Sequence, residues 1–545
     1  MDVPTPSISN QKILIESTQA LLSMGTEKML VDFGRANIIN KALQQPDKVK
    51  QVIQKIGTDG ISTTLNAVNN KLNVPVPLGY CNVGTVAACG IEAKDFKVGD
   101  RVVSNGPHAE IVSVSKNLCA KIPDSVSDDE ASFVVPGAIA LNGVRLAEPT
   151  IGENFVVFGL GLIGLLAVQI LKSQGCKVLG IDFDETKLKL AETYGAETYN
   201  PKDNESLVAK TQFFSKNNGV DGVIICASTN DDELIHQAAT ISRKRGRIIL
   251  IGTTGLKLSR QDFYEKELTF QVSCSYGPGR YDQNYEELGV DYPIAFVRWT
   301  EQRNFETVLQ LFKDKALKID NMISKKFQFD DAVKAYEVIQ KKNDLLGLIF
   351  VYTSKNANNK NKSPQTLQTK INDKSLPINT DKSINLSFIG AGQYATSFLI
   401  PLFQKSGAIL NSVSSESGLS AAYAMKKFKF SEASSNNKDT ISNKNVDAVV
   451  ISTRHDSHAS LIIDSINYRK HVFVEKPLCI NKSELQQIIE CISSSKSKKS
   501  ENIIMVGFNR RFSPHIKKIQ SLLENISTPK SFVMNVNAGS LDSSH

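Results

Sequence analysis

One stretch, residues 155–182, constrains the fold of this chain more than any other. A short apolar run is followed by three glycines in the spacing G-x-G-x-x-G, namely Gly159, Gly161 and Gly164. A helical apolar run and a second apolar strand come next, and that strand ends at Asp182. The order strand, glycine turn, helix, strand and acid predicts a parallel α/β sheet that binds a dinucleotide.

Each of these residues has a physical role in such a site. Gly159 permits a tight turn, Gly161 lets the backbone approach a diphosphate, and Gly164 lets the helix pack on the strand. The free N–H groups at the start of the helix face the phosphates. Asp182 can accept hydrogen bonds from both ribose hydroxyls and repels a 2′-phosphate, which favours NAD(H) over NADP(H). The alternative is a glycine-rich turn in an ordinary α/β core.

Length and composition indicate a large globular protein. At about 150 residues per domain, 545 residues suggest three or four domains. No apolar run reaches the roughly 18 residues of a membrane span, and the N-terminus lacks the features of a signal peptide. The eight cysteines are scattered without a C-x-x-C pair, as expected of reduced thiols. We therefore predict a cytoplasmic protein with no membrane partner.

The net charge of +8 is unevenly distributed. Basic residues outnumber acidic ones only after residue 352, where lysine is frequent. A nucleic-acid partner is one interpretation of such a basic region. However, no basic stripe alternates with aromatic residues, so we expect a solvated, lysine-rich surface and no nucleic-acid partner.

The pattern along the first 352 residues predicts an α/β architecture with two parts. Residues 12–22 favour a strand, residues 24–71 a broken helix, and residues 74–88 and 101–114 short strands. A helix begins at Asp128. Strands alternating with helices then predict a doubly wound parallel sheet; they are 155–158, 178–182, 222–226, 247–251 and 268–273. Residues 301–352 indicate helix, strand, helix and strand.

A second nucleotide fold follows a change in composition. Residues 353–382 are rich in Lys, Asn, Ser and Thr and predict a flexible linker. From residue 384 a strand leads into Gly390 and Gly392, with Ala395 at the third position of the turn. Further strands are predicted at 409–413, 447–451, 471–474 and 503–506. Two dinucleotide-binding folds in series are therefore expected.

Specific motifs link the two halves to known families. With its Lys97–Val102 turn and the Gly159–Gly164 turn, the first half resembles the medium-chain dehydrogenase/reductase family. With Gly390–Gly392, Ser452–His458 and Glu475-Lys476-Pro477, the second resembles the Gfo/Idh/MocA family of sugar dehydrogenases. The pairing resembles bacterial bi-domain oxidoreductases, which are similar to proteins linked with surface-polysaccharide synthesis.

The resemblance implies a domain layout and a substrate class. A GroES-like domain spans 1–125, completed by about 315–352, and a Rossmann domain spans 126–314. A linker at 353–383 leads to a second Rossmann domain at 384–507. Residues 508–545 begin an α+β substrate domain, with a helix at 515–524 and a strand at 531–536, which we expect to be incomplete. The implied substrate is a sugar or nucleotide-sugar, and the oligomeric state stays open, a homo-oligomer included.

Two family features are missing from the first half. Zinc-dependent members place a Cys ligand early and a Gly-His-Glu further on, whereas this chain has Ser23–Glu27 and Gly79-Tyr80-Cys81. The structural zinc loop is also missing from residues 101–110. Because catalytic zinc needs about three protein ligands, we predict no zinc and no other metal. Tyr80 can donate a proton to the substrate of the first half. A purely structural role as a buried tyrosine is an equal alternative.

In the second half the resemblance points to Lys476. The family's matching lysine lies by the nicotinamide and the reacting sugar carbon, where it can pass a proton. The resemblance also places Glu475 at the cofactor and His458 near the same pocket. Ser414 and Ser415 end the second strand, so NAD(H) and NADP(H) both remain open as cofactors of this domain.

These observations lead to three hypotheses. The first is an NAD(P)-dependent oxidoreductase acting on a sugar or nucleotide-sugar derivative. The second is a zinc-free carbonyl or quinone reductase that is active only in the first half. The third is a dinucleotide-binding protein without turnover.

Overall fold

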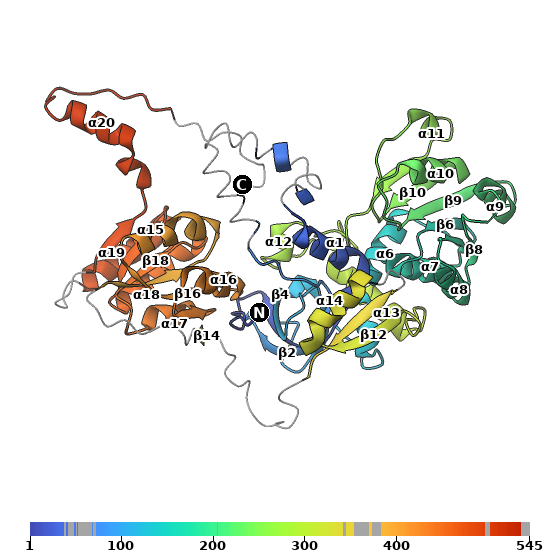
Figure 1. Cartoon of the computed structure of the whole chain (residues 1–545), viewed down its shortest axis with the longest axis horizontal. Helices are drawn as coiled ribbons and strands as arrows, with labels where there is room; N and C mark the ends of the chain where they lie inside the picture. Colours follow the sequence, from blue (N-terminus) through green and yellow to red (C-terminus); the bar gives the residue numbers. More distant parts are fainter. Residues whose placement is uncertain are drawn as a thin grey trace. The chain divides into compact units, whose positions relative to one another are not determined.

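The computed structural model describes residues 1–37, 74–203, 205–341, 345–353, 370–372, 383–495 and 502–535, with a few residues between 40 and 72. The chain divides into two compact units. Residues 1–353 build two sheets, and residues 370–506 supply the strands of a third (Figure 1). Within the described ranges, no helix has the length and apolar character needed to cross a bilayer.

The first sheet has seven strands in the order β12-β13-β1-β2-β3-β5, with β4 paired to β1. They are β1 (Lys12–Ser23), β2 (Asn82–Cys89), β3 (Arg101–Ser104), β4 (Ile111–Ser115), β5 (Cys119–Lys121), β12 (Ile323–Gln328) and β13 (Gly347–Val351). Antiparallel pairing joins residues 19–23 of β1 to β13. The chain therefore returns after residue 322 to complete its N-terminal sheet.

Helices cover this sheet and connect it to the next one. They are α1 (Met24–Arg35), α5 (Asp128–Ala131), α6 (Val134–Leu146), α13 (Glu301–Lys313) and α14 (Ala332–Lys341). At the start of α5, Ser127 and Glu130 form a reciprocal capping box, which explains why a helix begins at Asp128. Helices α6 and α13 pack closely, because a Cβ on Gly137 would lie 2.7 Å from the Val308 side chain.

The second sheet is parallel throughout and has the order β11-β10-β9-β6-β7-β8. Its strands are β6 (Asn154–Phe158), β7 (Lys177–Ile181), β8 (Glu197–Tyr199), β9 (Val220–Ile225), β10 (Ser242–Leu250) and β11 (Thr269–Val272). Its helices are α7 (Leu162–Ser173), α8 (Glu185–Thr193), α9 (Leu207–Phe214), α10 (Glu233–Ile241) and α11 (Arg260–Tyr264). The short α12 (Gln283–Glu286) contacts residues 116–118 instead, with Asn117 Nδ2 donating to the Tyr285 carbonyl oxygen at 3.0 Å. This order reverses between β6 and β9, which is the switch point where doubly wound sheets bind ligands.

Strand β6 shows why this sheet is buried on both faces. Phe155 and Val157 pack in one apolar cluster with α6 and α7. Val156 and Phe158 pack in a second cluster with α10. Because successive side chains of a strand point to opposite faces, a continuous apolar run is required here.

The third sheet has the order β14-β17-β16-β15-β18-β19-β20. Its strands are β14 (Lys370–Asn372), β15 (Asn385–Ile389), β16 (Ile409–Ser414), β17 (Glu432–Ser434), β18 (Ala448–Ile451), β19 (His471–Val474) and β20 (Ile504–Val506). Its helices are the π-helix η3 (Ala395–Leu399), α15 (Ile400–Lys405), α16 (Leu419–Phe428), α17 (Asn437–Ser442), α18 (His458–Asn467) and α19 (Lys482–Ser495); α20 (Pro514–Leu523) follows. Strands β15, β18, β19 and β20 run parallel.

Four predictions of local structure differ from the observed structure or concern residues that the structure does not describe. Helix α1 ends at Arg35, and most of residues 38–73 lie outside the described part. Residues 74–81 form no strand. Within the predicted linker, residues 370–372 form β14, which pairs antiparallel with β17. The strand predicted at 531–536 is wrong over 531–535, where the backbone pairs with no neighbour and the side chains are exposed.

Candidate active sites

The first glycine turn has the sterics that the motif predicts. Gly159 adopts φ +85°, and a Cβ there would lie 2.7 Å from the Ala227 nitrogen just beyond β9. A Cβ on Gly164 would lie 1.9 Å from the Gly159 carbonyl oxygen. By contrast, a Cβ on Gly161 would meet no heavy atom within 4 Å. The turn is therefore closed on the protein side and open at Gly161, where a diphosphate can approach.

Helix α7 and Asp182 complete this turn. Gly161 is the N-cap of α7 and no side chain caps the helix, so its first N–H groups point toward the open side. Asp182 Oδ2 accepts a hydrogen bond from Leu160 N at 2.7 Å. Its Oδ1 accepts from Asp184 N at 3.0 Å. Because each carboxylate oxygen accepts more than one hydrogen bond, Asp182 is anchored to the turn and can still bind ribose hydroxyls.

Polar side chains join the first sheet and α6 to the carboxyl end of β11. Asn105 Nδ2 donates to the Tyr276 hydroxyl at 3.1 Å, and Asn142 Nδ2 donates to Ser273 Oγ at 3.0 Å. Burial raises the pKa of Tyr276 to about 12, so this side chain stays protonated at neutral pH. The sequence analysis singled out none of these contacts, which depend on pairing across 131 and 171 residues.

Tyr80 lies half-buried against the core of the first half, directly after a closely packed glycine. Gly79 adopts φ +89°, and a Cβ there would lie 2.6 Å from the His108 ring. His108 Nε2 is 3.1 Å from both oxygens of the fully buried Glu27. Tyr336 also donates to Glu27, which ties α14 to α1. This buried network could not be predicted from sequence patterns, because its members are separated by 81 and 309 residues.

The Gly-His-Glu ligand segment of zinc-dependent family members is replaced here by Gly79-Tyr80-Cys81. The buried Cys81 thiol donates to the Ser132 carbonyl oxygen at 2.9 Å. Burial raises the pKa of the Cys81 thiol to about 12. Throughout the described residues, no three His, Cys, Asp or Glu side chains are grouped to hold a metal. The expectation of no zinc nevertheless stays a prediction.

The second glycine turn has nearly the same sterics as the first. Gly390 adopts φ +96°, and a Cβ there would lie 2.6 Å from the Ser452 carbonyl oxygen just beyond β18. A Cβ on Gly392 would meet nothing within 4 Å. Ala395 is buried and begins the π-helix η3, an irregularity that is frequent at functional sites. This turn is also open where a diphosphate can approach.

Glu475, Lys476 and Pro477 follow β19 at the carboxyl edge of this sheet. Glu475 N donates to the Ile451 carbonyl oxygen at 2.9 Å, and the Lys476–Pro477 peptide bond is cis. Lys476 is exposed, whereas His458 is fully buried. His458 lies next to the same turn, with Nδ1 2.6 Å from the Pro477 carbonyl oxygen. The structure therefore brings these residues together, but His458 faces main chain; its predicted catalytic role stays a prediction.

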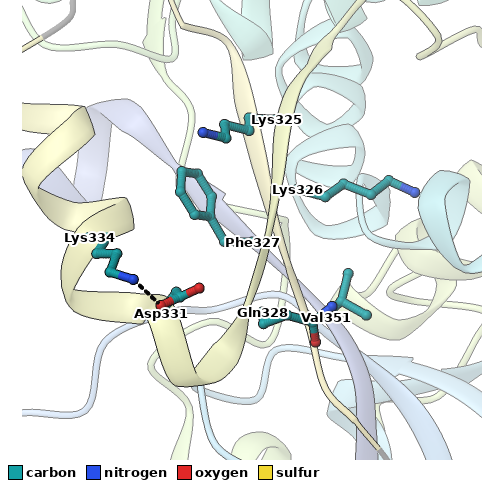
Figure 2. A pocket seen from close by; sticks show the side chains of 7 residues that line it. All are labelled: Lys325, Lys326, Phe327, Gln328, Asp331, Lys334 and Val351. Atoms are coloured by element: carbon teal, nitrogen blue, oxygen red, sulfur yellow. Dashed lines mark hydrogen bonds and ion pairs between the residues drawn. The ribbon is translucent and has the colours of Figure 1, made fainter.

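Two hollows lie outside these turns. Figure 2 shows a pocket of about 370 Å³ between β12, β13 and α14, with Lys334 paired to Asp331 at 2.7 Å. A wider groove of about 1180 Å³ is lined by Arg145 and Trp299, whose guanidinium carbon and ring centroid are 3.4 Å apart. Neither hollow is lined by a residue of the two glycine turns or by a predicted catalytic residue.

Comparison with known proteins agrees with this geometry. Residues 163–289 match the family model for zinc-binding dehydrogenases. Residues 384–508 match the model for an oxidoreductase family with an NAD-binding Rossmann fold, Gfo/Idh/MocA. The chain is an oxidoreductase. It combines a zinc-binding-dehydrogenase region with a Gfo/Idh/MocA Rossmann domain, and its Rossmann folds bind NAD(P).

Several characterised proteins are similar to the first half of this two-part oxidoreductase. D-guloside 3-dehydrogenase of Escherichia coli K12 is 26% identical over 269 residues, covering 48% of this chain and 72% of the relative. (R,R)-butanediol dehydrogenase of Bacillus subtilis is 25% identical over 290 residues, covering 48% and 76%. The crystal structure of 2R,3R-butanediol dehydrogenase from B. subtilis has a TM-score of 0.48 and 21% identity, covering 64% of this chain and 95% of that one.

Proposed function

We propose that this two-part oxidoreductase moves hydride between NAD(P) and a hydroxyl-bearing carbon of a sugar or nucleotide-sugar derivative. The observation that carries the proposal is the pair of glycine turns, each open at its second glycine and each at the carboxyl end of paired parallel strands. Relatives named for the dehydrogenation of a guloside and of butanediol support an alcohol carbon as the reacting centre. A cytoplasmic role in surface-polysaccharide synthesis belongs to the same proposal.

In the first half, Gly161 and the N-terminus of α7 would bind the diphosphate, and Asp182 would accept hydrogen bonds from the ribose, which favours NAD(H). When bound, the nicotinamide supplies or accepts the hydride. In the reducing direction the substrate carbonyl carbon would accept hydride while its oxygen gains a proton from a side chain, and Tyr80 is the candidate donor of that proton. No metal takes part in this proposal, because the chain has Gly79-Tyr80-Cys81 where zinc-dependent members have Gly-His-Glu.

In the second half, Gly390, Gly392 and Ala395 would hold an NAD(H) or NADP(H) diphosphate, with Glu475 beside it. Lys476 would hold or release the substrate proton, because it is exposed at the end of β19 where the sheet binds ligands. Its four-carbon stem gives it reach, so its backbone must be well fixed for the ammonium group to be placed precisely.

The test is cofactor binding followed by turnover. We expect NADH to bind the full chain at two sites, with Gly161→Val removing one and Gly392→Val the other, because either side chain would occupy the open approach to a diphosphate. A panel of sugars and nucleotide-sugars is then screened for NADH formation. Absence of NADH and NADPH binding would end the proposal.

Two other outcomes would redirect the proposal. Tight binding without turnover on any sugar would favour a dinucleotide-binding protein that does not catalyse. Turnover of simple carbonyls or quinones that survives removal of residues 353–545 would favour a zinc-free reductase confined to the first half.

A further inference from the structure

His458 is enclosed by the protein main chain. It begins α18 and its side chain is fully buried. Nδ1 lies 2.6 Å from the Pro477 carbonyl oxygen, and Nε2 lies 3.2 Å from the Thr453 carbonyl oxygen. A carbonyl oxygen only accepts hydrogen bonds and a neutral imidazole carries one N–H, so the shorter contact marks Nδ1 as the donor to Pro477. The ring therefore spans two backbone segments and presents no open face to a substrate.

The two segments leave neighbouring strands at the same edge of the sheet. Thr453 follows the end of β18 by two residues, and Pro477 follows the end of β19 by three. The ends of these parallel strands are in register, with Ile451 opposite Val474. This is the edge at which parallel sheets bind their ligands. His458 thus connects the two strand exits that flank the predicted second site.

Other contacts secure the backbone on either side of Lys476. Gly507 N donates to the Val474 carbonyl oxygen at 2.8 Å. The Glu475 carboxylate packs on Gly507, where a Cβ would lie 2.9 Å from Oε1. These contacts hold the residues before Lys476, and the hydrogen bond from His458 holds the residue after it. The backbone is therefore held on both sides of Lys476, whose own side chain is exposed.

We propose that His458 is a positioning residue, whose hydrogen bonds hold the Lys476–Pro477 turn so that Lys476 faces a nicotinamide dinucleotide on the second glycine turn. This inference rests on the proposed function for its ligand. It differs from the expectation that His458 itself transfers a proton, because the ring is fully buried and both of its nitrogens face backbone carbonyl oxygens. It also differs from a plain core histidine, whose loss would lower stability without changing Lys476.

The test follows the reactivity of Lys476 in the full-length protein. The chain is acetylated with N-hydroxysuccinimidyl acetate, with and without saturating NADH or NADPH, and each lysine is quantified by mass spectrometry. The exposed Lys482 is the internal reference. In the wild-type chain we expect dinucleotide to slow Lys476 acetylation relative to Lys482. His458→Leu is expected to lose about fivefold of that protection, which corresponds to one hydrogen bond.

Two further variants separate positioning from stability. His458→Asn places an amide nitrogen close to the position of Nδ1 and is expected to restore protection, whereas His458→Gln, whose amide lies further out, is not. The matched control is His471→Leu, because His471 accepts a hydrogen bond from Ile503 N at 3.0 Å at the other end of β19. It should leave Lys476 unchanged. The Asn and Gln comparison also keeps the test open if the Leu variant does not fold.

The outcomes are distinguishable. Equal protection of Lys476 in wild-type and His458→Leu chains of equal melting temperature would overturn the inference, as would equal behaviour of the Asn and Gln variants. If no dinucleotide protects wild-type Lys476, the proposed function of the second half fails. The inference is then judged on acetylation without dinucleotide, where His458→Leu must change the Lys476 rate and His458→Asn must restore it.

Discussion

The two glycine turns are alike at their first two motif positions and differ at the third. Gly159 and Gly390 both adopt positive φ angles, +85° and +96°. A Cβ on either glycine would lie within 3 Å of the backbone that follows a neighbouring strand. Gly161 and Gly392 both face open space. Two unrelated stretches of sequence therefore meet the same steric requirements at the first two positions, which shows that these requirements are local to the turn.

The third position separates them. A Cβ on Gly164 would lie 1.9 Å from a backbone oxygen of its own turn, whereas Ala395 carries a Cβ and is buried. The first turn leads into the regular helix α7, while the second leads into the wider π-helix η3. We infer that the π-helix accommodates the methyl group that the first turn excludes.

The largest effect is expected from exchanging this third residue. Gly164→Ala should lower the free energy of unfolding of the first half by about 3 kcal/mol, because the methyl group meets backbone that cannot rotate away. Ala395→Gly should cost less than about 1 kcal/mol. Urea unfolding measured by the fluorescence of Trp299, the one tryptophan, reports the first half, and circular dichroism reports both. Equal costs in the two variants would refute the difference.

A second contrast concerns pH. Both carboxylate oxygens of Glu301 are buried, and no described residue hydrogen-bonds them. Burial, with Glu286 nearby and Arg280 opposing, raises the pKa of Glu301 to about 8. The folded first half therefore retains a proton that the unfolded chain releases near its ordinary value of 4.5, so its stability falls from about pH 4.5 to pH 8.

Glu301→Gln is expected to remove that fall. Between pH 5.5 and 8 the wild-type first half should lose about 3 kcal/mol more than the variant, again measured through Trp299. Among its described residues, the second half has no buried carboxyl with a raised pKa, so its own transition should not share this loss. Parallel pH profiles for wild type and Glu301→Gln would contradict the prediction.

The residue at the end of the second strand gives a smaller contrast. Asp182→Ser should lower the affinity of the first site for NADH about tenfold relative to NADPH, because the carboxylate that repels a 2′-phosphate is lost. Ser415→Asp should shift the second site toward NADH. Dissociation constants for both dinucleotides, measured in Gly392→Val or Gly161→Val backgrounds, report each site alone. An unchanged ratio of the NADH and NADPH dissociation constants at each site would show that neither residue distinguishes the two riboses.

The smallest expected effect is that of metal removal. Because Cys81 is a buried thiol bonded to a carbonyl oxygen, dialysis against EDTA should leave cofactor binding and turnover unchanged. Elemental analysis before and after dialysis provides the control. Activity that falls with EDTA and returns with Zn²⁺ would show a metal site that these residues do not form.

Much of the fold could be predicted because its signals are short-range. Most predicted strands of the two parallel sheets were located within two residues, since buried strands are continuous apolar runs between glycine turns. Strands β5, β8, β14 and β17 were missed, because three residues are too few for a periodic pattern. The predicted strand at 531–536 was wrong, because an apolar stretch forms a strand only where another strand pairs with it.

The sequence by itself determined where the two glycine turns lie and which glycines cannot be replaced, because a positive φ or a close backbone approach is set within a few residues. Only the tertiary structure decided that Glu27 meets His108 and Tyr336, and that His458 is enclosed by carbonyl oxygens. Such hydrogen bonds join segments that are brought together when the apolar faces of separate strands and helices pack. The local residue pattern does not indicate which distant segments will form these hydrogen bonds.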